Sequence, residues 1–404
     1  MTSRERVLAY LSHAPHDGRP VLPIYPCLYR APAERTALRD LYAERFGRNG
    51  SIPVDFDTHI ALRMEARLRA DARVGEDPDW IDVGFAEGPE DCDGAHLQVD
   101  GTALLWSGPR QDDPIDLCAP PPTVGAWHTD LDPTDFAAID AALPVPEPQE
   151  LLASGRLELA RRLIEHNAGE RFVVSQPLGA PFWSAYGLLG FQGLMELIAR
   201  GDYVALRYIM ERSLARTHSF MMAMARVGVE GVFVEECLAS DDIISPTAYQ
   251  RYALPYECRI VETAQLCRLK PVLYFCGGVG HRLTHLASLE AGALAFEESK
   301  KGFRIDIGNV RTVVGPKVPL LGNTDVMLIH RGDAMALETE IRRQAEAAGS
   351  GPFAHSFGSP LPLDTPPENA ALFARLVRET RDSHLFRERG SELSTVVVPH
   401  SRNR

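Results

Sequence analysis

The sequence predicts an α/β protein whose core is a (β/α)8 TIM barrel with an inserted hairpin-containing region. From residue 150 onward, short apolar runs alternate with longer helical patterns, which is typical of a parallel sheet. Two further apolar runs, at 20–25 and 52–56, bring the total to about eight strands, the number that closes a barrel. A doubly wound open sheet is the rival. It calls for a glycine-rich phosphate loop after an early strand, and the sequence has none there.

The elements follow in chain order. Residues 3–12 are predicted to form a helix, followed by a strand at 20–25, a helix at 34–46 and a strand at 52–56. Region 77–148 is polar and rich in proline, with a hairpin signal at 99–102, so we expect an insertion and not a separate domain. Beyond it the predicted strands are 172–177, 231–236, 271–276, 293–298, 318–323 and 353–357. Residues 1–385 are thus one barrel domain that ends with a helix at 367–382, and 386–404 are a polar C-terminal tail.

Composition narrows the function classes. The net charge is -13 and no basic run occurs, so nucleic acid is not an expected partner. No apolar run is long enough to span a bilayer, and the N-terminal helical pattern is no signal peptide. Seven cysteines without paired spacing indicate free thiols in a reducing cytoplasm. We therefore expect a cytoplasmic protein with a small-molecule substrate. The oligomeric state cannot be predicted.

The stretch 270–301 carries the main chemical signal. It has the pattern strand, loop, helix, strand, and by alternation Tyr274 and Cys276 share one face of the first strand. Glu298 follows the second strand. Both strands deliver their last side chains to the same end of a parallel sheet, where α/β folds place their chemistry. A thiolate beside a carboxylate is a half-site for zinc. The alternative is a buried cysteine and a glutamate that caps a helix.

Other strand ends supply further candidates. Glu236 and His355 would complete a zinc site with Cys276 and Glu298. Each has a structural alternative, because a strand-end glutamate often caps a helix and a histidine can be buried in a core. The candidate catalytic residues, which lie at or near strand ends and suit a small organic substrate, are Tyr274, Asp55, Gln176 and Asn323.

From residue 4 to 382 the chain resembles the uroporphyrinogen decarboxylase superfamily. The resemblance rests on short motifs in a fixed order: RERVLAYL at 4–11, RPVLP at 19–23, GVEG at 228–231, IISP at 243–246, LPY at 254–256, KPV at 270–272, LGN at 321–323 and DTPPEN at 364–369. The resemblance implies a (β/α)8 barrel, in agreement with the strand count.

Two chemistries are implied by this resemblance. True uroporphyrinogen decarboxylases are metal-free and carry Arg-Pro-Pro and Met-Arg-Gln-Ala-Gly-Arg signatures, whereas this chain has GRPV at 18–21 and LYRA at 28–31. Their polycarboxylate substrate needs convergent arginines, and the sequence indicates no such cluster near the first strands. The other branch is zinc-dependent methyl transfer, as in corrinoid methyltransferases. Two zinc ligands of those enzymes correspond to Cys276 and Glu298 of this chain. At the position of their usual histidine this chain has Tyr274, and at that of their last cysteine it has Ser359.

The leading hypothesis is a methyltransferase that uses zinc to assist methyl transfer involving a small methylated substrate. A metal-free decarboxylase or lyase acting on a small carboxylated substrate is the alternative, with Asp55, Tyr274 or Glu298 handling protons. A non-catalytic barrel that binds a ligand or a corrinoid protein is the third. The chain has no Asp-x-His-x-x-Gly segment, so a corrinoid would have to be carried by a separate protein partner.

Overall fold

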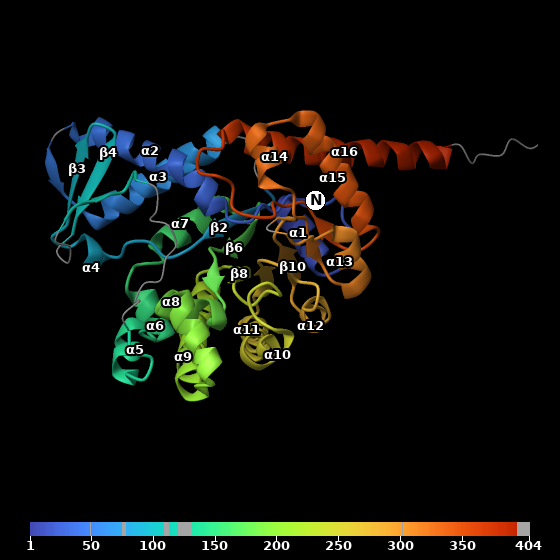
Figure 1. Cartoon of the computed structure of the whole chain (residues 1–404). Helices are drawn as coiled ribbons and strands as arrows, with labels where there is room; N and C mark the ends of the chain where they lie inside the picture. Colours follow the sequence, from blue (N-terminus) through green and yellow to red (C-terminus); the bar gives the residue numbers. More distant parts are fainter. Residues whose placement is uncertain (49, 75–77, 109–112, 120–130, 301, 394–404) are drawn as a thin grey trace, which may run out of the picture.

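The computed structural model describes residues 1–48, 50–74, 78–108, 113–119, 131–300 and 302–393 (Figure 1). Its main feature is a parallel sheet in the order β12-β11-β10-β9-β8-β6-β2, with the short strand β7 also paired to β8. The strands are β2 (Trp80–Val83), β6 (Phe172–Ser175), β7 (Leu178–Gly179), β8 (Gly231–Glu236), β9 (Lys270–Phe275), β10 (Ala293–Phe296), β11 (Leu320–Leu321) and β12 (Phe353–Ala354).

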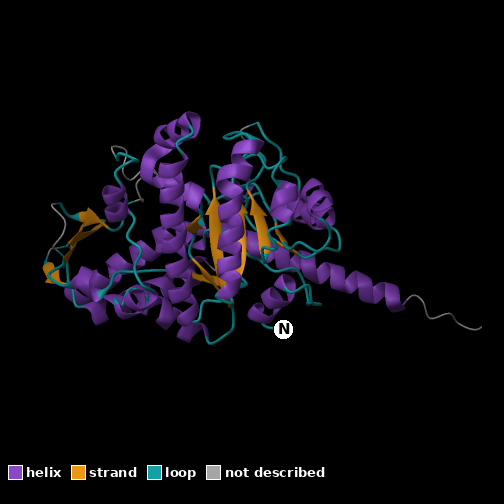
Figure 2. Cartoon of the chain, turned by 90° about the horizontal axis from the view of Figure 1, so that it is seen from below, coloured by secondary structure: helices purple, strands orange, loops and turns teal. Residues whose placement is uncertain are grey.

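The two ends of this sheet are joined by residues 20–22. On one side, the Leu22 amide donates to the His355 carbonyl and the His355 amide donates to the Pro20 carbonyl, both at 2.8 Å. On the other side, the Asp79 amide donates to the Val21 carbonyl at 2.9 Å. Residues 20–22 therefore lie between β12 and β2 and supply the first barrel strand, as predicted. The curled sheet with its helices confirms the TIM-barrel fold class (Figure 2).

Helices surround the strands on the outside (Figure 2). The helices that accompany the barrel are α1 (Ser3–Leu11), α7 (Glu158–Asn167), α8 (Pro181–Arg200), α9 (Tyr203–Arg226), α10 (Pro246–Ala248), the π-helix η1 (Tyr249–Ala253), α11 (Leu254–Leu266), α12 (Leu283–Ala287), α13 (Ile307–Val314), α14 (Val326–Arg331), α15 (Ala334–Ala348) and α16 (Pro367–Leu393). Helix α16 continues beyond the predicted end at 382, and residues 394–404 of the predicted tail lie outside the described residues.

The strand predicted at 52–56 is not a barrel strand. In the structure β1 (Ser51–Pro53) pairs antiparallel with β3 (His96–Asp100), which pairs in turn with β4 (Ala103–Ser107) and β4 with β5 (Ile115–Asp116). This small sheet lies at one side of the molecule, beside α2 (Pro26–Phe46) and α3 (Phe56–Val74) (Figure 1). The predicted hairpin is thus confirmed in β3 and β4, while the second barrel strand is β2. A short apolar run alone does not reveal its partner strand.

The predicted insertion 77–148 therefore includes a barrel strand, β2. Its predicted start, Asp77, and residues 109–112 and 120–130 lie outside the described residues. The remaining short helices of this part are α4 (Pro89–Cys92) and α5 (Phe136–Ala142), and α6 (Pro148–Ala153) follows. Within the described residues, no helix is long and apolar enough to cross a membrane.

Strand side chains alternate between two buried clusters. The interior cluster, inside the barrel, includes Trp80, Phe172, Phe233 and Tyr274. The outer cluster, between strands and helices, takes the neighbouring positions, Ile81, Val173, Val232, Val234, Leu273 and Phe275 among them. This division decides which strand-end residues can reach a substrate in the barrel.

Gly231 gives a test of the interior packing. A methyl group on its Cα would lie 2.7 Å from the Phe172 ring and 3.2 Å from the Lys270 carbonyl. We therefore expect Gly231→Ala to lower the free energy of unfolding by about 1–3 kcal/mol. Denaturant titration measures this change. The double variant with Phe172→Leu should recover part of the loss, and equal losses in both variants would contradict the packing argument.

Candidate active site

Two thiols lie at the carboxyl ends of adjacent barrel strands. Cys237 follows β8 and Cys276 follows β9, and both pack against the interior cluster. Their Sγ atoms are 2.8 Å apart, and both side chains are half-buried. Burial and the hydrogen bond with Cys276 raise the pKa of Cys237, the hydrogen bond having the larger effect. The raised pKa keeps Cys237 protonated, and either sulfur can donate in the contact between the two thiols.

Glu235 lies on the same face, two residues before Cys237. Its Oε2 accepts a hydrogen bond of 2.5 Å from the Tyr25 hydroxyl, and its Oε1 accepts one of 2.9 Å from the Trp183 indole. Burial raises the pKa of Glu235, although these two hydrogen bonds oppose the shift. The side chain as a whole is half-buried, so a substrate in the barrel can reach it. A carboxyl group with a raised pKa in a reachable position is suited to general acid catalysis.

The backbone at Tyr25 is held in an unusual conformation. Its φ of 51° and ψ of 48° lie in the left-handed region, which a bulky residue rarely adopts. The conformation directs the ring into the barrel, where it contacts Phe233 at 5.3 Å and Tyr274 at 5.5 Å between ring centroids. Backbone strain of this kind is common where a side chain must be aimed at a reaction site.

Lys300 forms a cluster with Glu297, Glu298 and Ser359, just after the carboxyl end of β10. The Nζ of Lys300 is 2.7 Å from Glu297 Oε1, 3.1 Å from Glu298 Oε1 and 2.6 Å from the Ser359 hydroxyl. The second oxygen of Glu297 accepts the Gly277 amide at 2.8 Å, which connects the cluster to the loop after Cys276. The Lys300 ammonium thus stands beside both Glu298 and Ser359, the positions at which the sequence resemblance places a metal ligand.

The predicted zinc set of Cys276, Glu298, Glu236 and His355 is not assembled. Glu236 shares its face with Val232 and Val234 of the outer cluster, and its neighbour there is Glu257 of α11. The ring of His355 packs at 5.0 Å on Phe353, also in the outer cluster, and burial lowers the pKa of His355 to about 3. On β8 it is Glu235, and not Glu236, that has the inward position with Phe233.

The residues at the mouth do not fit a catalytic zinc ion. Such sites use three protein ligands from histidine, cysteine and carboxylate side chains. Within the described ranges, no three or more of these side chains come together in a way that could hold a metal. The thiol pair offers two sulfur atoms, and Lys300 already neutralises the carboxylates that could join them.

The four predicted catalytic residues lie at different places in the structure. Tyr274 faces the interior, its hydroxyl donates to the Gly358 carbonyl at 2.9 Å, and burial raises its pKa. Gln176 lies at the carboxyl end of β6 and lines the cavity described next. Asn323 is buried and donates to the carbonyls of Glu297 and Ile305, so it braces a loop. Asp55 is exposed, beside the small sheet, and accepts from the Thr58 amide at 2.9 Å, so it is not at the barrel mouth.

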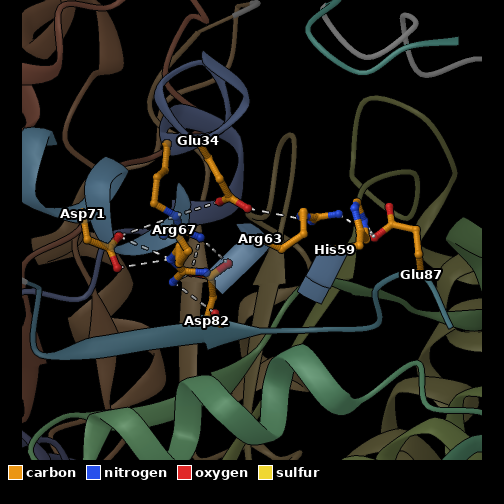
Figure 3. Close-up of polar contacts among 8 residues, drawn as sticks. Glu34, His59, Arg63, Arg67, Asp71, Asp82 and Glu87 are labelled. Atoms are coloured by element: carbon orange, nitrogen blue, oxygen red, sulfur yellow. Dashed lines mark hydrogen bonds and ion pairs between the residues drawn. The ribbon is translucent and has the colours of Figure 1, made fainter. Parts of the chain in front are cut away.

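A cavity of about 220 Å³ opens at the carboxyl ends of β2 and β6. Four arginines line it, contrary to the expectation that no such cluster exists: Arg30, Arg35, Arg63 and Arg67. Figure 3 shows how carboxylates meet the guanidinium groups of Arg63 and Arg67. Arg67 contacts Asp71 and Asp82, and Arg63 contacts Glu34 and Glu87. Arg30, Arg63 and Arg67 are therefore paired with acidic side chains of the chain itself, whereas Arg35 donates to the Ala119 carbonyl.

Asp82 is the centre of this network. It shares its face of β2 with Trp80 of the interior cluster, and it contacts Arg30 at 2.9 Å and Arg67 at 3.1 Å. Burial alone would raise the pKa of Asp82, but the two guanidinium groups outweigh it and lower the pKa. The network places Arg30 beside the barrel mouth as a buried, fully charged group.

We expect Asp82→Ala to lower the free energy of unfolding by about 3 kcal/mol, because it leaves two buried guanidinium groups without their shared partner. Thermal and urea unfolding measure the change. Glu44→Ala is the matched control, since Glu44 pairs with Arg69 on the exposed surface at 3.3 Å and should cost less than about 1 kcal/mol. Equal effects of the two substitutions would contradict a structural role for the Asp82 network.

Several site residues were not predicted from the sequence: Arg30, Asp82, Glu235, Cys237 and Lys300. Signals for some were present. Arg63 and Arg67 are four residues apart and so share one helix face, and Glu235 and Cys237 share a strand face with Phe233. The sequence did not show whether each of these faces points toward the barrel interior or away from it.

Comparisons with known proteins agree with this architecture. The family model described as uroporphyrinogen decarboxylase (URO-D) matches residues 130–380, more than half of the chain. The uroporphyrinogen decarboxylase of Trichlorobacter lovleyi is 25% identical over 205 residues, 49% of this chain and 58% of that protein. That of Pseudoalteromonas atlantica is 27% identical over 247 residues, 59% of this chain and 66% of that protein. Each match thus spans less than two thirds of the relative's length.

A solved structure extends the comparison to nearly the whole chain. The structure titled methyltransferase from Methanosarcina mazei has a TM-score of 0.62 and 17% sequence identity, and the match covers 94% of this chain and 99% of that one. At this identity the likeness shows a shared fold. Together with the family model, it leads to one conclusion: the chain belongs to the uroporphyrinogen decarboxylase (URO-D) family.

Proposed function

We propose that this chain is a methyltransferase that acts on a small methylated substrate at the barrel mouth, with Glu235 as the general acid. The observation that carries the proposal is Glu235 itself, a reachable carboxyl group with a raised pKa at a strand end. Tyr25 and Trp183 hold both of its oxygens and fix its direction. Proton donation by a positioned side chain contributes about 10²–10⁴ to a rate.

Methyl transfer from oxygen or nitrogen needs such an acid. An acceptor from outside the chain forms a bond to the methyl carbon, the bond from that carbon to oxygen or nitrogen breaks, and the leaving atom takes the Glu235 proton. Without the proton, an alkoxide or amide anion would have to leave in a site with little water. A small thiol or a corrinoid on a separate protein is a suitable acceptor class. For zinc assistance, expected from the sequence, the part of the chain that the structure describes offers no matching ligand set.

The walls of the mouth suit an apolar donor. Tyr25, Phe233 and Tyr274 contact one another as rings, and Trp183 stacks on Tyr186 at 4.9 Å. Aromatic surfaces of this kind hold a small organic molecule and leave one polar group, Glu235, to orient it. This arrangement supports a substrate with one methylated heteroatom near the Glu235 carboxyl.

A metal-free decarboxylase or lyase is the second candidate. Lys300, whose side chain is partly exposed at the mouth, is the cation that would meet a carboxylated substrate. In that reaction Glu235 would protonate the carbon from which carbon dioxide leaves. The two candidates use the same acid but give different products.

Product analysis distinguishes them. The purified full chain is incubated with methylamine or an aryl methyl ether, each with a thiol acceptor, and in parallel with small aromatic carboxylic acids. We expect loss of a methyl group from one donor and a methylated thiol, unaffected by added chelator. Release of carbon dioxide without methyl transfer would reject the methyltransferase in favour of the lyase. Ligand binding without either product would indicate a non-catalytic barrel.

A further inference from the structure

We propose that Cys237 and Cys276 form a redox-active dithiol that reacts with small organic disulfides and closes into a reversible intramolecular disulfide. This inference is independent of the proposed reaction, because it rests on the placement of the two sulfur atoms. It adds a covalent modification site at the barrel mouth.

The strand register places the two cysteines side by side. Glu236 of β8 is the partner of Phe275 of β9, and the amide of Cys276 donates to the Glu236 carbonyl at 3.0 Å. The next pair along these parallel strands is Cys237 and Cys276. Neighbouring strands lie about 4.7–4.9 Å apart, which is within the Cα separation of about 4.4–6.8 Å that disulfides require.

The side chains are already turned toward each other. The Sγ atoms are 2.8 Å apart as free thiols, with both cysteines on the interior face. Closing the bond therefore needs a small side-chain rotation and no change in strand pairing. Ring closure between two residues so placed is fast compared with attack by a second molecule from solution.

The pair can also be reached and activated. Both side chains are half-buried, in contrast to the buried Cys92. After Cys276 the chain turns through Gly277, with a φ of 78°, so no bulky side chain follows the sulfur directly. Cys237 is followed by Leu238, whereas Cys276 is followed by a glycine, so we assign Cys276 as the sulfur that attacks and Cys237 as the one that resolves.

The reaction balances with an organic disulfide as oxidant. The Cys276 thiolate attacks one sulfur of the reagent, its sulfur–sulfur bond breaks, and one thiol leaves. Cys237 then loses its proton, its sulfur attacks Cys276 Sγ, and the second thiol leaves. Two electrons pass from the cysteine pair to the reagent, and the two thiol protons end on the two released thiols. A small dithiol reverses both steps.

Oxidised glutathione tests the proposal on the full chain. After increasing exposure, free thiols are blocked and peptides are mapped by mass spectrometry without reduction. We expect the 237–276 peptide pair to appear crosslinked, with the loss of two hydrogens, at lower oxidant than modifies any other cysteine. Dithiothreitol should restore both thiols. The readout is a peptide mass, so failure here is separate from failure of the methyltransferase assay.

Serine variants give the order of attack. Cys237→Ser should retain a stable glutathione adduct on Cys276, because the resolving sulfur is gone, whereas Cys276→Ser should leave Cys237 largely unmodified. Cys258→Ser, on helix α11, is the matched control and should crosslink like the wild type. Circular dichroism checks that each variant is folded. A stable adduct at Cys276 in the wild type, or no reaction at either cysteine while Cys258 is modified, would overturn the proposal.

Discussion

Glu235→Gln is expected to lower turnover by about 10²–10⁴-fold while the protein stays folded. Glutamine keeps an acceptor for Tyr25 or Trp183 but has no acidic proton to give to a leaving group. The turnover number should fall more than the substrate affinity changes, because the proton is needed in the transition state. Steady-state kinetics on the donor identified by product analysis measures both quantities.

Glu236→Gln is the control for this prediction. It changes the adjacent residue in the same chemical way, but its side chain points away from the barrel toward Glu257. Turnover should remain near the wild-type value at neutral pH. If Glu236→Gln loses as much activity as Glu235→Gln, the assignment of the inward face to Glu235 is wrong. If Glu235→Gln retains full activity, another group supplies the proton.

Stability is expected to fall steeply as the pH rises from about 4.5 to 8. Burial, with the nearby Glu257 second, raises the pKa of Glu236 to about 8, and burial raises that of Glu257 to about 7. Both pKa values lie above the ordinary glutamate value in the unfolded chain. The folded protein therefore binds these protons more tightly. The stabilisation is complete below the unfolded pKa and is lost as the pH passes through the folded values.

The size of the stability loss depends on how far each pKa in the folded protein lies above its value in the unfolded chain. For Glu236 alone it reaches about 5 kcal/mol, and the two coupled groups do not add fully. Urea unfolding at several pH values measures the slope. Glu236→Gln should flatten the slope and raise stability at about pH 9, because a neutral amide needs no proton to stay buried. A wild-type stability that is constant or rises over this range would contradict the buried acidic pair.

The sequence of β8 does not show which of its two adjacent glutamates, Glu235 or Glu236, points into the barrel. Residues 232–236 read Val, Phe, Val, Glu, Glu, so both faces of β8 are apolar until the last two positions. In a parallel barrel both strand faces are buried, and the pattern of apolar residues does not mark the interior. The outward Glu236 lies beside Glu257 of α11 and accepts a hydrogen bond of 3.0 Å from the Leu238 amide.

The sequence by itself determined the alternation of strands and helices, and hence the barrel class. It also determined that Tyr274 and Cys276 share a face and lie at a strand end, because alternation and strand direction are local properties. The hairpin of β3 and β4 was local as well, since a short turn joins its two strands.

Only the tertiary structure decided which face of each strand is inside, and therefore that Glu235 and Cys237, not Glu236 and His355, accompany Cys276. The structure also shows that the second barrel strand is β2 and not 52–56, and that Lys300 contacts Glu298 and Ser359. Strand pairing and ion pairing join residues far apart in the chain, and their free energy depends on burial and distance in the folded state. No pattern within a short window of sequence contains those distances.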